Sequence, residues 1–372
     1  MRKVKVLLVQ LASTGDCLFV TTIAKQIKEL DYPGCELTWL IGSRYAHVLF
    51  NNPYIDHIIQ IPLIVVEDIQ NQRDNIAEHI ANAGGYAAYD NIFITDFIPV
   101  NNKNWYGTSR SSLFKSYPHP LKINPQPLIY LTDKESINVA EFCRKNNITS
   151  NTFNILFECS PLSNQSLMTF QKAKQIAEEL VIQNRDIKFI LTSNRAFTSN
   201  NPAIIDGSTI TWRENAELAN YCQLLVGCSS GISWLCTSNW TKSIPIIQII
   251  RPNFAHGLYS ASMKADFKFW GIDTKNLIEL YDPVDGIIKE CIMAAANNNF
   301  ATVQKKYNIK NNSAFLNYRF IKDARISTYE KTGHFLRYFF NTPLLSIYRS
   351  VKPQWFTPVY WMKKSNSNKQ IT

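Results

Sequence analysis

An acidic residue that could act as a general base follows the first apolar run of the chain. Residues 4–11 are mostly apolar, which predicts a buried strand, and apolar residues then recur at helical spacing up to position 30. Between them lies the turn Ala-Ser-Thr-Gly-Asp at 12–16, where Gly15 permits a tight bend. Asp16 would lie at the carboxyl edge of a sheet and could take the proton of an attacking hydroxyl group. The alternative is that Thr14 or Asp16 only caps the helix.

A second turn of small residues, GCSSGIS at 227–233, follows a predicted strand and leads into a predicted helix at 232–238. Hydroxyl and N–H groups at such a position could bind the diphosphate of a nucleotide. The alternative is an ordinary serine-capped start of a helix. Two further strand ends and this turn supply the candidate donor-binding residues: Ser193, Asn194, Ser229, Ser230, Gly231, Ile232 and Arg251.

Residues 98–126 form a long polar stretch after a predicted strand at 91–97. A segment of this length is typical of a functional loop or of a loosely ordered helix. Together with the first turn, it supplies the candidate acceptor-binding residues: Ser13, Thr14, Gly15, Trp105 and Arg110.

Several motifs are missing from the sequence. It has no GxGxxG after the first strand, no GxxxxGK[ST], no GxSxG and no HExxH. It also lacks a DxD pair, so we expect backbone N–H groups and cationic side chains to hold a diphosphate, with no metal and no other cofactor. The eight cysteines form no CxxC pair, which predicts free thiols in a reducing compartment.

Strand and helix patterns alternate along most of the chain and predict an α/β protein. The first set has strands at 4–11, 36–42, 55–61, 91–97 and 127–131 and a helix at 133–145. After an asparagine-rich linker at 146–154, strands follow at 153–159, 187–192, 204–210, 223–227 and 246–250, and a helix at 283–296 closes the series. We therefore predict two Rossmann-like domains, 1–148 and 149–300, that face each other across an active-site cleft.

The positive charge is concentrated at the C-terminal end. The net charge is +10, but residues 301–372 hold thirteen lysines and arginines against two acids, and the rest is nearly neutral. This distribution argues against a nucleic-acid partner. Aromatic residues alternate with cations at 334–361, which favours a helical tail on an anionic membrane surface over an arm packed on the body. We expect a cytoplasmic protein, peripheral on the inner face of the cytoplasmic membrane.

Residues 6–59 resemble the N-terminal block of the heptosyltransferase-type glycosyltransferases of family 9. The shared pattern is a strand, an S-x-G-D turn at 13–16, a T-T helix and an N-P-x-[IV]-D segment at 52–56. The resemblance implies the GT-B fold of two facing Rossmann-like domains. It also implies inverting, metal-independent transfer of a sugar from a nucleotide-diphosphate donor to a bacterial lipopolysaccharide-like acceptor, with Asp16 as the catalytic aspartate.

The second domain departs from the pattern of that family. The motif D-[ST]-G-x-x-H corresponds to residues 229–234, where Ser229 replaces the aspartate and Trp234 the histidine. The basic residue expected before the first helix of the domain is replaced around Gln165 and Ser166. These departures favour a hexosyl or heptosyl donor other than ADP-heptose. They also keep open a non-catalytic GT-B scaffold that binds a glycan or nucleotide in surface-polysaccharide assembly. A third alternative, a nucleotide-sugar epimerase or related two-domain enzyme, would not need the basic aromatic tail.

Overall fold

The computed structural model describes residues 2–63, 65–98, 101, 109–161, 165–251 and 262–307. Trp105 and nearly all of the predicted tail at 301–372 lie outside the described residues. Among the residues that are described, no helix is both long enough and apolar enough to cross a bilayer.

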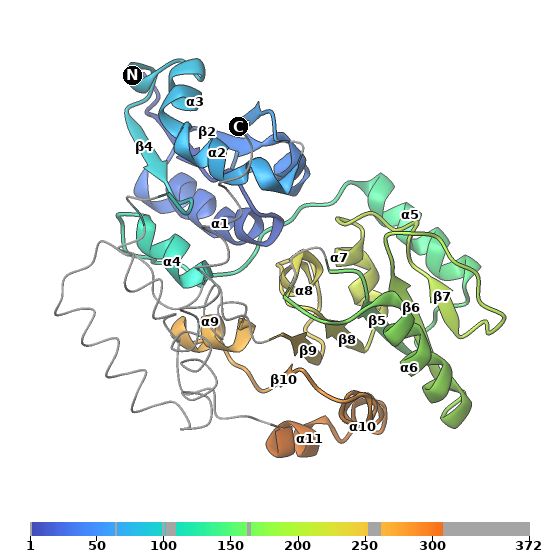
Figure 1. Ribbon diagram of the computed structural model, residues 1–372. Coiled ribbons are helices and arrows are strands. Elements are labelled where there is room, and N and C mark those ends of the chain that lie inside the picture. The colour runs from blue at the N-terminus through green and yellow to red at the C-terminus, as the bar shows by residue number, and fades with distance from the viewer. Residues whose placement is uncertain are drawn as a thin grey trace, which may run out of the picture.

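The first half of the chain folds around a four-stranded parallel sheet (Figure 1). Its strands, in the order β3-β2-β1-β4, are β1 (Lys5–Val9), β2 (Glu36–Gly42), β3 (His57–Ile61) and β4 (Asn91–Ile94). Successive side chains of a strand point to opposite faces. Val6 and Leu8 accordingly join the apolar cluster under helix α1 (Thr14–Gln26), whereas Leu7 and Val9 pack with α3 (Ile76–Asn82) on the other face.

The remaining helices of this half are short. A π-helical turn, Ile27–Asp31, extends α1, and a 3₁₀ helix, Ser43–Leu49, follows β2. Between β3 and β4 lie α2 (Ile69–Asp74) and α3, and α4 (Ser109–Ser116) packs against α1.

The second half folds around a six-stranded parallel sheet in the doubly wound order β10-β9-β8-β5-β6-β7. The strands are β5 (Phe153–Glu158), β6 (Ile187–Thr192), β7 (Ile204–Asp206), β8 (Leu224–Gly227), β9 (Ile246–Ile250) and β10 (Leu277–Tyr281). One face carries α6 (Phe170–Gln183), α10 (Asp285–Ala296) and α11 (Phe300–Tyr307). The other carries α7 (Asn215–Leu218), α8 (Gly231–Leu235) and α9 (Met263–Phe269).

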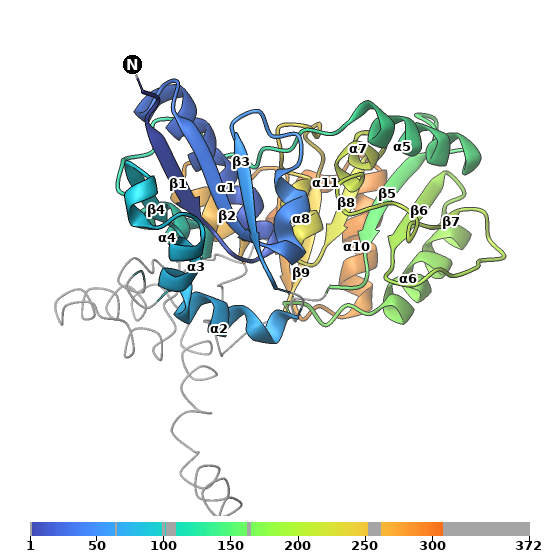
Figure 2. The same cartoon turned by 90° about the horizontal axis from the view of Figure 1, so that it is seen from above.

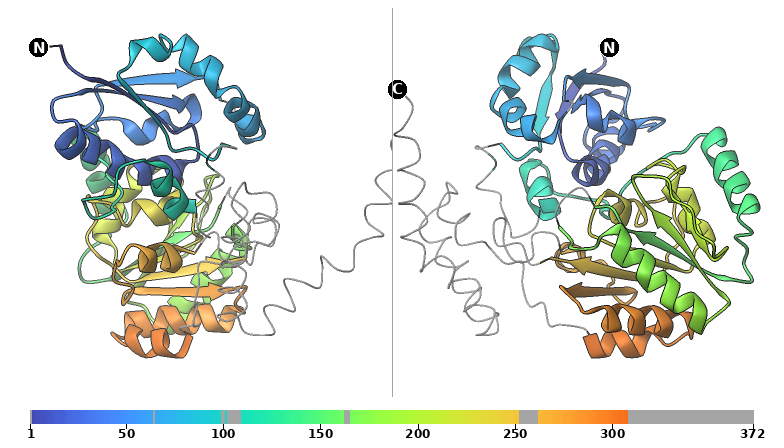
Figure 3. Two further views of the ribbon diagram at one scale, coloured as in Figure 1. Left: turned by 90° about the vertical axis from the view of Figure 1, so that its left-hand side faces the viewer. Right: turned by 45° about the vertical axis from the view of Figure 1, so that its right-hand side comes forward.

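The chain crosses between the halves earlier than the sequence indicated. Residues 127–131 form no strand, because their N–H groups bond side chains instead of a neighbouring strand: Leu128 N donates to Thr21 Oγ1 at 2.8 Å and Ile129 N to Asn239 Oδ1 at 2.8 Å. The next helix, α5 (Asp133–Lys145), packs against α7 beside the second sheet (Figures 1 and 3). The crossing therefore precedes α5, and the asparagine-rich stretch at 146–154 lies within the second half in space.

The halves meet where α1 packs against α8, between the two sheets (Figure 2). The Phe19 and Trp234 rings lie 5.4 Å apart there, and one apolar cluster contains core residues of both halves. The predicted α/β class with two facing Rossmann-like halves is confirmed, whereas α9, β10 and α11 were not predicted.

Candidate active site

Asp16 lies in the first turn of α1 with 8% of its surface exposed. Its Oδ2 accepts a hydrogen bond from Ser13 Oγ at 3.1 Å, so one carboxylate oxygen has the capping role considered above. Its Oδ1 has no hydrogen-bond partner among the described residues and lies 3.3 Å from Arg110 Nε. The cap and the candidate base are therefore two oxygens of the same carboxylate.

Arg110 and Trp234 complete the group around Asp16. Arg110, from α4, is 4% exposed, and its guanidinium carbon lies 4.4 Å from the centre of the Trp234 ring, which belongs to the other half. A side chain at Gly15 would begin 3.1 Å from Trp234 Cδ1 and 3.2 Å from Arg110 Nη2. The lack of a side chain at Gly15 therefore leaves room for the close approach of Trp234 and Arg110.

Asp96, which follows β4, positions the turn that carries Asp16. Its buried carboxylate accepts from Leu11 N at 2.6 Å and from Ala12 N at 3.3 Å, directly before the turn. Arg73 Nε donates to Asp96 Oδ1 at 2.7 Å. Sequence reasoning missed this pair. The available signal was an acid at the end of a strand that is a neighbour of β1 in the sheet.

A buried carboxylate, Glu158, lies beneath the serine-rich turn of the second half. The hydroxyls of Ser230 and Ser233 donate to it, the latter at 3.0 Å, and Cys228 N donates at 2.8 Å. Burial raises the pKa of Glu158 to about 7. The Ser230 hydroxyl, expected to face a diphosphate, is thus directed to a carboxylate of its own chain, and Glu158 was not predicted.

The two predicted turns are in contact with each other. A side chain at Gly231 would begin 2.9 Å from Trp212 Nε1 and 3.2 Å from Thr14 Cγ2. Ser229 N donates to Gln248 Oε1 at 2.6 Å, which fixes the start of the second turn. The structure therefore brings the candidate acceptor residue Thr14 next to the candidate donor residue Gly231.

The remaining candidate residues lie at strand ends of the second sheet. Ser193 and Asn194 follow β6, and the Ser193 hydroxyl oxygen accepts from Arg195 N at 3.0 Å. Arg251 is exposed after β9, and its N donates to Gln165 O at 2.7 Å. These residues line the same carboxyl edge as Glu158, which ends β5.

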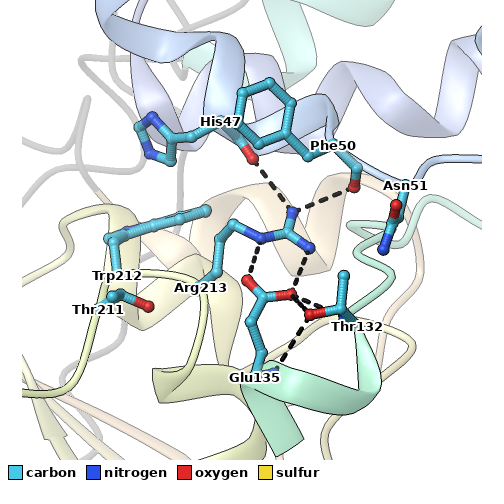
Figure 4. Close-up of a pocket in the computed structure, with 8 residues that line it drawn as sticks. All are labelled: His47, Phe50, Asn51, Thr132, Glu135, Thr211, Trp212 and Arg213. Atoms are coloured by element: carbon cyan, nitrogen blue, oxygen red, sulfur yellow. Dashed lines mark hydrogen bonds and ion pairs between the residues drawn. The ribbon is translucent and has the colours of Figure 1, made fainter.

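A pocket of about 690 Å³ opens between the two halves, where the sequence predicted a cleft, but none of its lining residues was among the predicted site residues. Arg213 lies at its centre and donates to the backbone oxygens of His47 at 3.1 Å and Phe50 at 3.2 Å, as well as to Glu135 Oε1 at 2.6 Å (Figure 4). Burial lowers the pKa of His47. The pocket is lined by His47, Phe50, Asn51, Thr132, Glu135, Thr211, Trp212 and Arg213.

The described part of the chain contains no cluster of three or more histidine, cysteine, aspartate or glutamate residues with the arrangement of a metal site. All eight cysteines are buried and form no disulfide.

Two solved structures are similar to this chain over nearly their whole lengths. One is a family 9 glycosyltransferase from Veillonella parvula DSM 2008, 16% identical, with a TM-score of 0.50 over 87% of this chain and 97% of that chain. The other is the E. coli ADP-heptose lipopolysaccharide heptosyltransferase II, 13% identical, with a TM-score of 0.52 over 79% and 99%. No protein-family model and no curated protein matches the chain. The likeness expected from residues 6–59 is thus confirmed at the level of fold: the chain has the two-domain GT-B fold of the family 9 glycosyltransferases.

Proposed function

We propose that this protein is a glycosyltransferase that moves a hexose or heptose from a nucleotide-diphosphate donor to a lipopolysaccharide or another bacterial surface glycan. The observation that best supports this proposal concerns Asp16 Oδ1. This oxygen has no hydrogen bond in the described structure and lies where the two halves meet. The fold supports the proposal because structures of this shape include a heptosyltransferase.

In the proposed reaction Asp16 Oδ1 accepts the proton of the acceptor hydroxyl as its oxygen bonds to the anomeric carbon. The bond from that carbon to the donor diphosphate breaks on the opposite side, so the configuration inverts. Ser13, Thr14, Gly15, Trp105 and Arg110 are proposed to contact the acceptor, and no metal takes part.

The donor is proposed to bind along the carboxyl edge of the second sheet. Because Ser230 is bonded to Glu158, the donor phosphates would be bound by Arg251 and by backbone groups more than by serine hydroxyls. The proposed donor contacts are Ser193, Asn194, Ser229, Ser230, Gly231, Ile232 and Arg251.

The test is sugar transfer from a panel of nucleotide sugars to a membrane glycolipid fraction by wild type and by Asp16→Asn. General-base catalysis contributes about 10²- to 10⁴-fold, so the variant should lose at least 100-fold in kcat. Its donor affinity should change little, whereas its melting temperature should fall because the buried Arg110 loses its carboxylate partner, so kcat is measured well below the unfolding transition. Asp186→Asn, at an exposed acid between α6 and β6, is the control and should retain full activity. Turnover by Asp16→Asn at the wild-type rate would remove Asp16 from the mechanism.

A second candidate function is a non-catalytic scaffold that binds a glycan or nucleotide. The observation that favours it is the engagement of Ser230 and Ser233 with Glu158, which occupies hydroxyls of the candidate donor turn. Thermal unfolding with each nucleotide sugar separates the two functions. Stabilisation by one donor together with turnover supports the enzyme, whereas stabilisation by none supports the scaffold.

We also propose that the basic tail binds the cytoplasmic membrane surface. Deletion of residues 330–372 should weaken sedimentation with vesicles containing anionic lipid. Equal sedimentation of both proteins would contradict this role.

A further inference from the structure

Arg110 is a buried cation whose hydrogen-bonding capacity is largely unused. The guanidinium has five N–H groups, and the side chain is 4% exposed. Nε and Nη1, which carry three of those N–H groups, form no hydrogen bond with the described residues. A buried donor without a partner is costly, and more so when it is charged, so folding should not retain such a group unless something else binds it.

Among the described residues, the charged partner of Arg110 is Asp16. Asp16 Oδ1 lies 3.3 Å from Nε, a distance that gives charge attraction without an aligned hydrogen bond. Trp234, under the guanidinium, adds an indole Nε1–H that also has no partner among the described residues. Three neighbouring side chains thus have unused hydrogen-bonding capacity, and their unused donors outnumber the unused acceptor.

The described rings that pack around Trp234 and Phe19 carry no hydrogen-bond acceptor. Trp234 is fully buried, and its ring lies 5.4 Å from that of Phe19 and 6.1 Å from that of Phe267. Phe114, also buried, lies 5.0 Å from Phe19. A low-polarity environment strengthens any charge–charge contact made inside it.

We propose that Arg110, assisted by the Trp234 indole N–H, binds an anionic oxygen group of a substrate beside Asp16. The planar guanidinium fork matches the two oxygens of a phosphate or a carboxylate. The description of the ligand as a substrate rests on the proposed function, but the anion site itself does not. The anion has two possible sources, the diphosphate of the donor or an acidic substituent on the acceptor sugar.

Anion binding here would also release the general base. A phosphate or carboxylate that takes up the guanidinium N–H groups competes with Asp16 for the same charge. Asp16 Oδ1 is then free to accept the proton of a hydroxyl. Arg110 thereby links the presence of the charged substrate group to the availability of the base.

The test compares wild type, Arg110→Gln and Arg110→Lys by calorimetric titration and by thermal unfolding. The probes are pyrophosphate and nucleoside diphosphates for the donor source, and glucuronic acid and glucose 6-phosphate, with glucose as neutral control, for the acceptor source. Arg110→Gln should bind the responsible anions about 10- to 100-fold more weakly, because charge-assisted hydrogen bonds are lost. The anion affinity of Arg110→Lys should lie between those of wild type and Arg110→Gln, since lysine keeps the charge but lacks the planar guanidinium fork.

Two further variants keep the outcome decisive. Arg185→Gln, at an exposed site between α6 and β6, removes the same charge and should bind anions as wild type does. Trp234→Phe keeps one aromatic ring but removes the N–H together with part of the indole volume, so it should weaken anion binding a few-fold. Arg185→Gln should fold as wild type does even if Arg110→Gln is unstable.

Equal anion affinity in wild type, Arg110→Gln and Arg110→Lys, or no binding of any anionic probe by wild type, would overturn the inference. If nucleotide sugars are turned over while anion binding ignores Arg110, the inference fails and the proposed function stands. If Arg110-dependent anion binding occurs but no nucleotide sugar binds, the proposed function fails and the anion site stands.

Discussion

Replacement of Arg213 by methionine tests how the two halves are held together beside the pocket. Arg213 donates to Glu135 at 2.6 Å, to Tyr130 O at 2.6 Å, and to the backbone oxygens of His47 and Phe50 in the other half. Methionine keeps much of the aliphatic volume but has no donor. The variant therefore leaves a carboxylate and three carbonyl oxygens without this partner.

The magnitude follows from the burial of the pair. Removing one partner of a buried ion pair costs about 3–5 kcal/mol. The Glu135 side chain is 19% exposed and the adjoining pocket of about 690 Å³ can admit water, so we expect the lower end, about 3 kcal/mol. Glu135→Gln, which retains an acceptor oxygen, should lower the free energy of unfolding by about 1 kcal/mol. The double variant Arg213→Met, Glu135→Gln should show a coupling energy of at least about 1 kcal/mol.

The assay is urea unfolding at several pH values. Burial would raise the pKa of Glu135, but Arg213 and the Thr132 backbone N–H outweigh it and hold the pKa below its ordinary value. A depressed folded-state pKa contributes stability above the unfolded value, about 4.3, and that stability is lost as pH falls through the folded value. The difference between wild type and Arg213→Met should therefore shrink below about pH 4.

The control for this series is Arg185→Met, at an exposed site. Its free energy of unfolding should lie within about 0.5 kcal/mol of that of wild type. This account of the contact would be refuted if Arg213→Met lowered the free energy of unfolding by less than about 0.5 kcal/mol at pH 7. A coupling energy near zero between Arg213→Met and Glu135→Gln would also refute it.

Three further predictions follow from single contacts. Asp96→Asn should lower kcat more than donor affinity, because it weakens the bonds that hold the turn before the proposed base; steady-state kinetics measures the split, and an unchanged kcat would contradict it. Gly15→Ala should lower the free energy of unfolding by about 1 kcal/mol in urea because Trp234 leaves no space, whereas the control Gly286→Ala, in open space within α10, should raise it by up to about 1 kcal/mol. The free energy of unfolding of Glu158→Gln should rise by up to about 3 kcal/mol relative to wild type between pH 4.5 and pH 8, since a carboxyl with a pKa of about 7 in the fold and about 4.3 in the unfolded chain penalises folding increasingly over that window; parallel stability curves would contradict it.

Local pattern in the sequence was sufficient to place Asp16 and its turn. A strand, a glycine and an acid adjoin each other within a few residues, and that local order survives folding. Arg110 was identified as a candidate, but its contact with Trp234 was not, because the two side chains come from different halves. Glu158 was missed for the same reason: it meets Ser230 only because β5 and β8 are neighbours in the sheet.

Two errors in element assignment have equally specific causes. Residues 127–131 have an apolar, strand-like composition, but their N–H groups are satisfied by Thr21 and Asn239 side chains. The strand β10 (Leu277–Tyr281) was overlooked because Glu279 interrupts its apolar run. In the folded chain that carboxylate accepts from Ser262 Oγ at 2.7 Å and from Lys264 N at 2.8 Å, which makes its burial tolerable.

The packing of Phe19 against Trp234 limits how often the protein can adopt a wide-open shape. Exposing two such rings to water costs about 2–3 kcal/mol each, so molecules with the halves fully apart would be fewer than about one in a thousand. Substrates would then have to reach the Asp16 carboxylate through small side-chain displacements while Phe19 and Trp234 remain packed together. The substrate affinity measured for the protein would therefore already include the free-energy cost of these side-chain displacements.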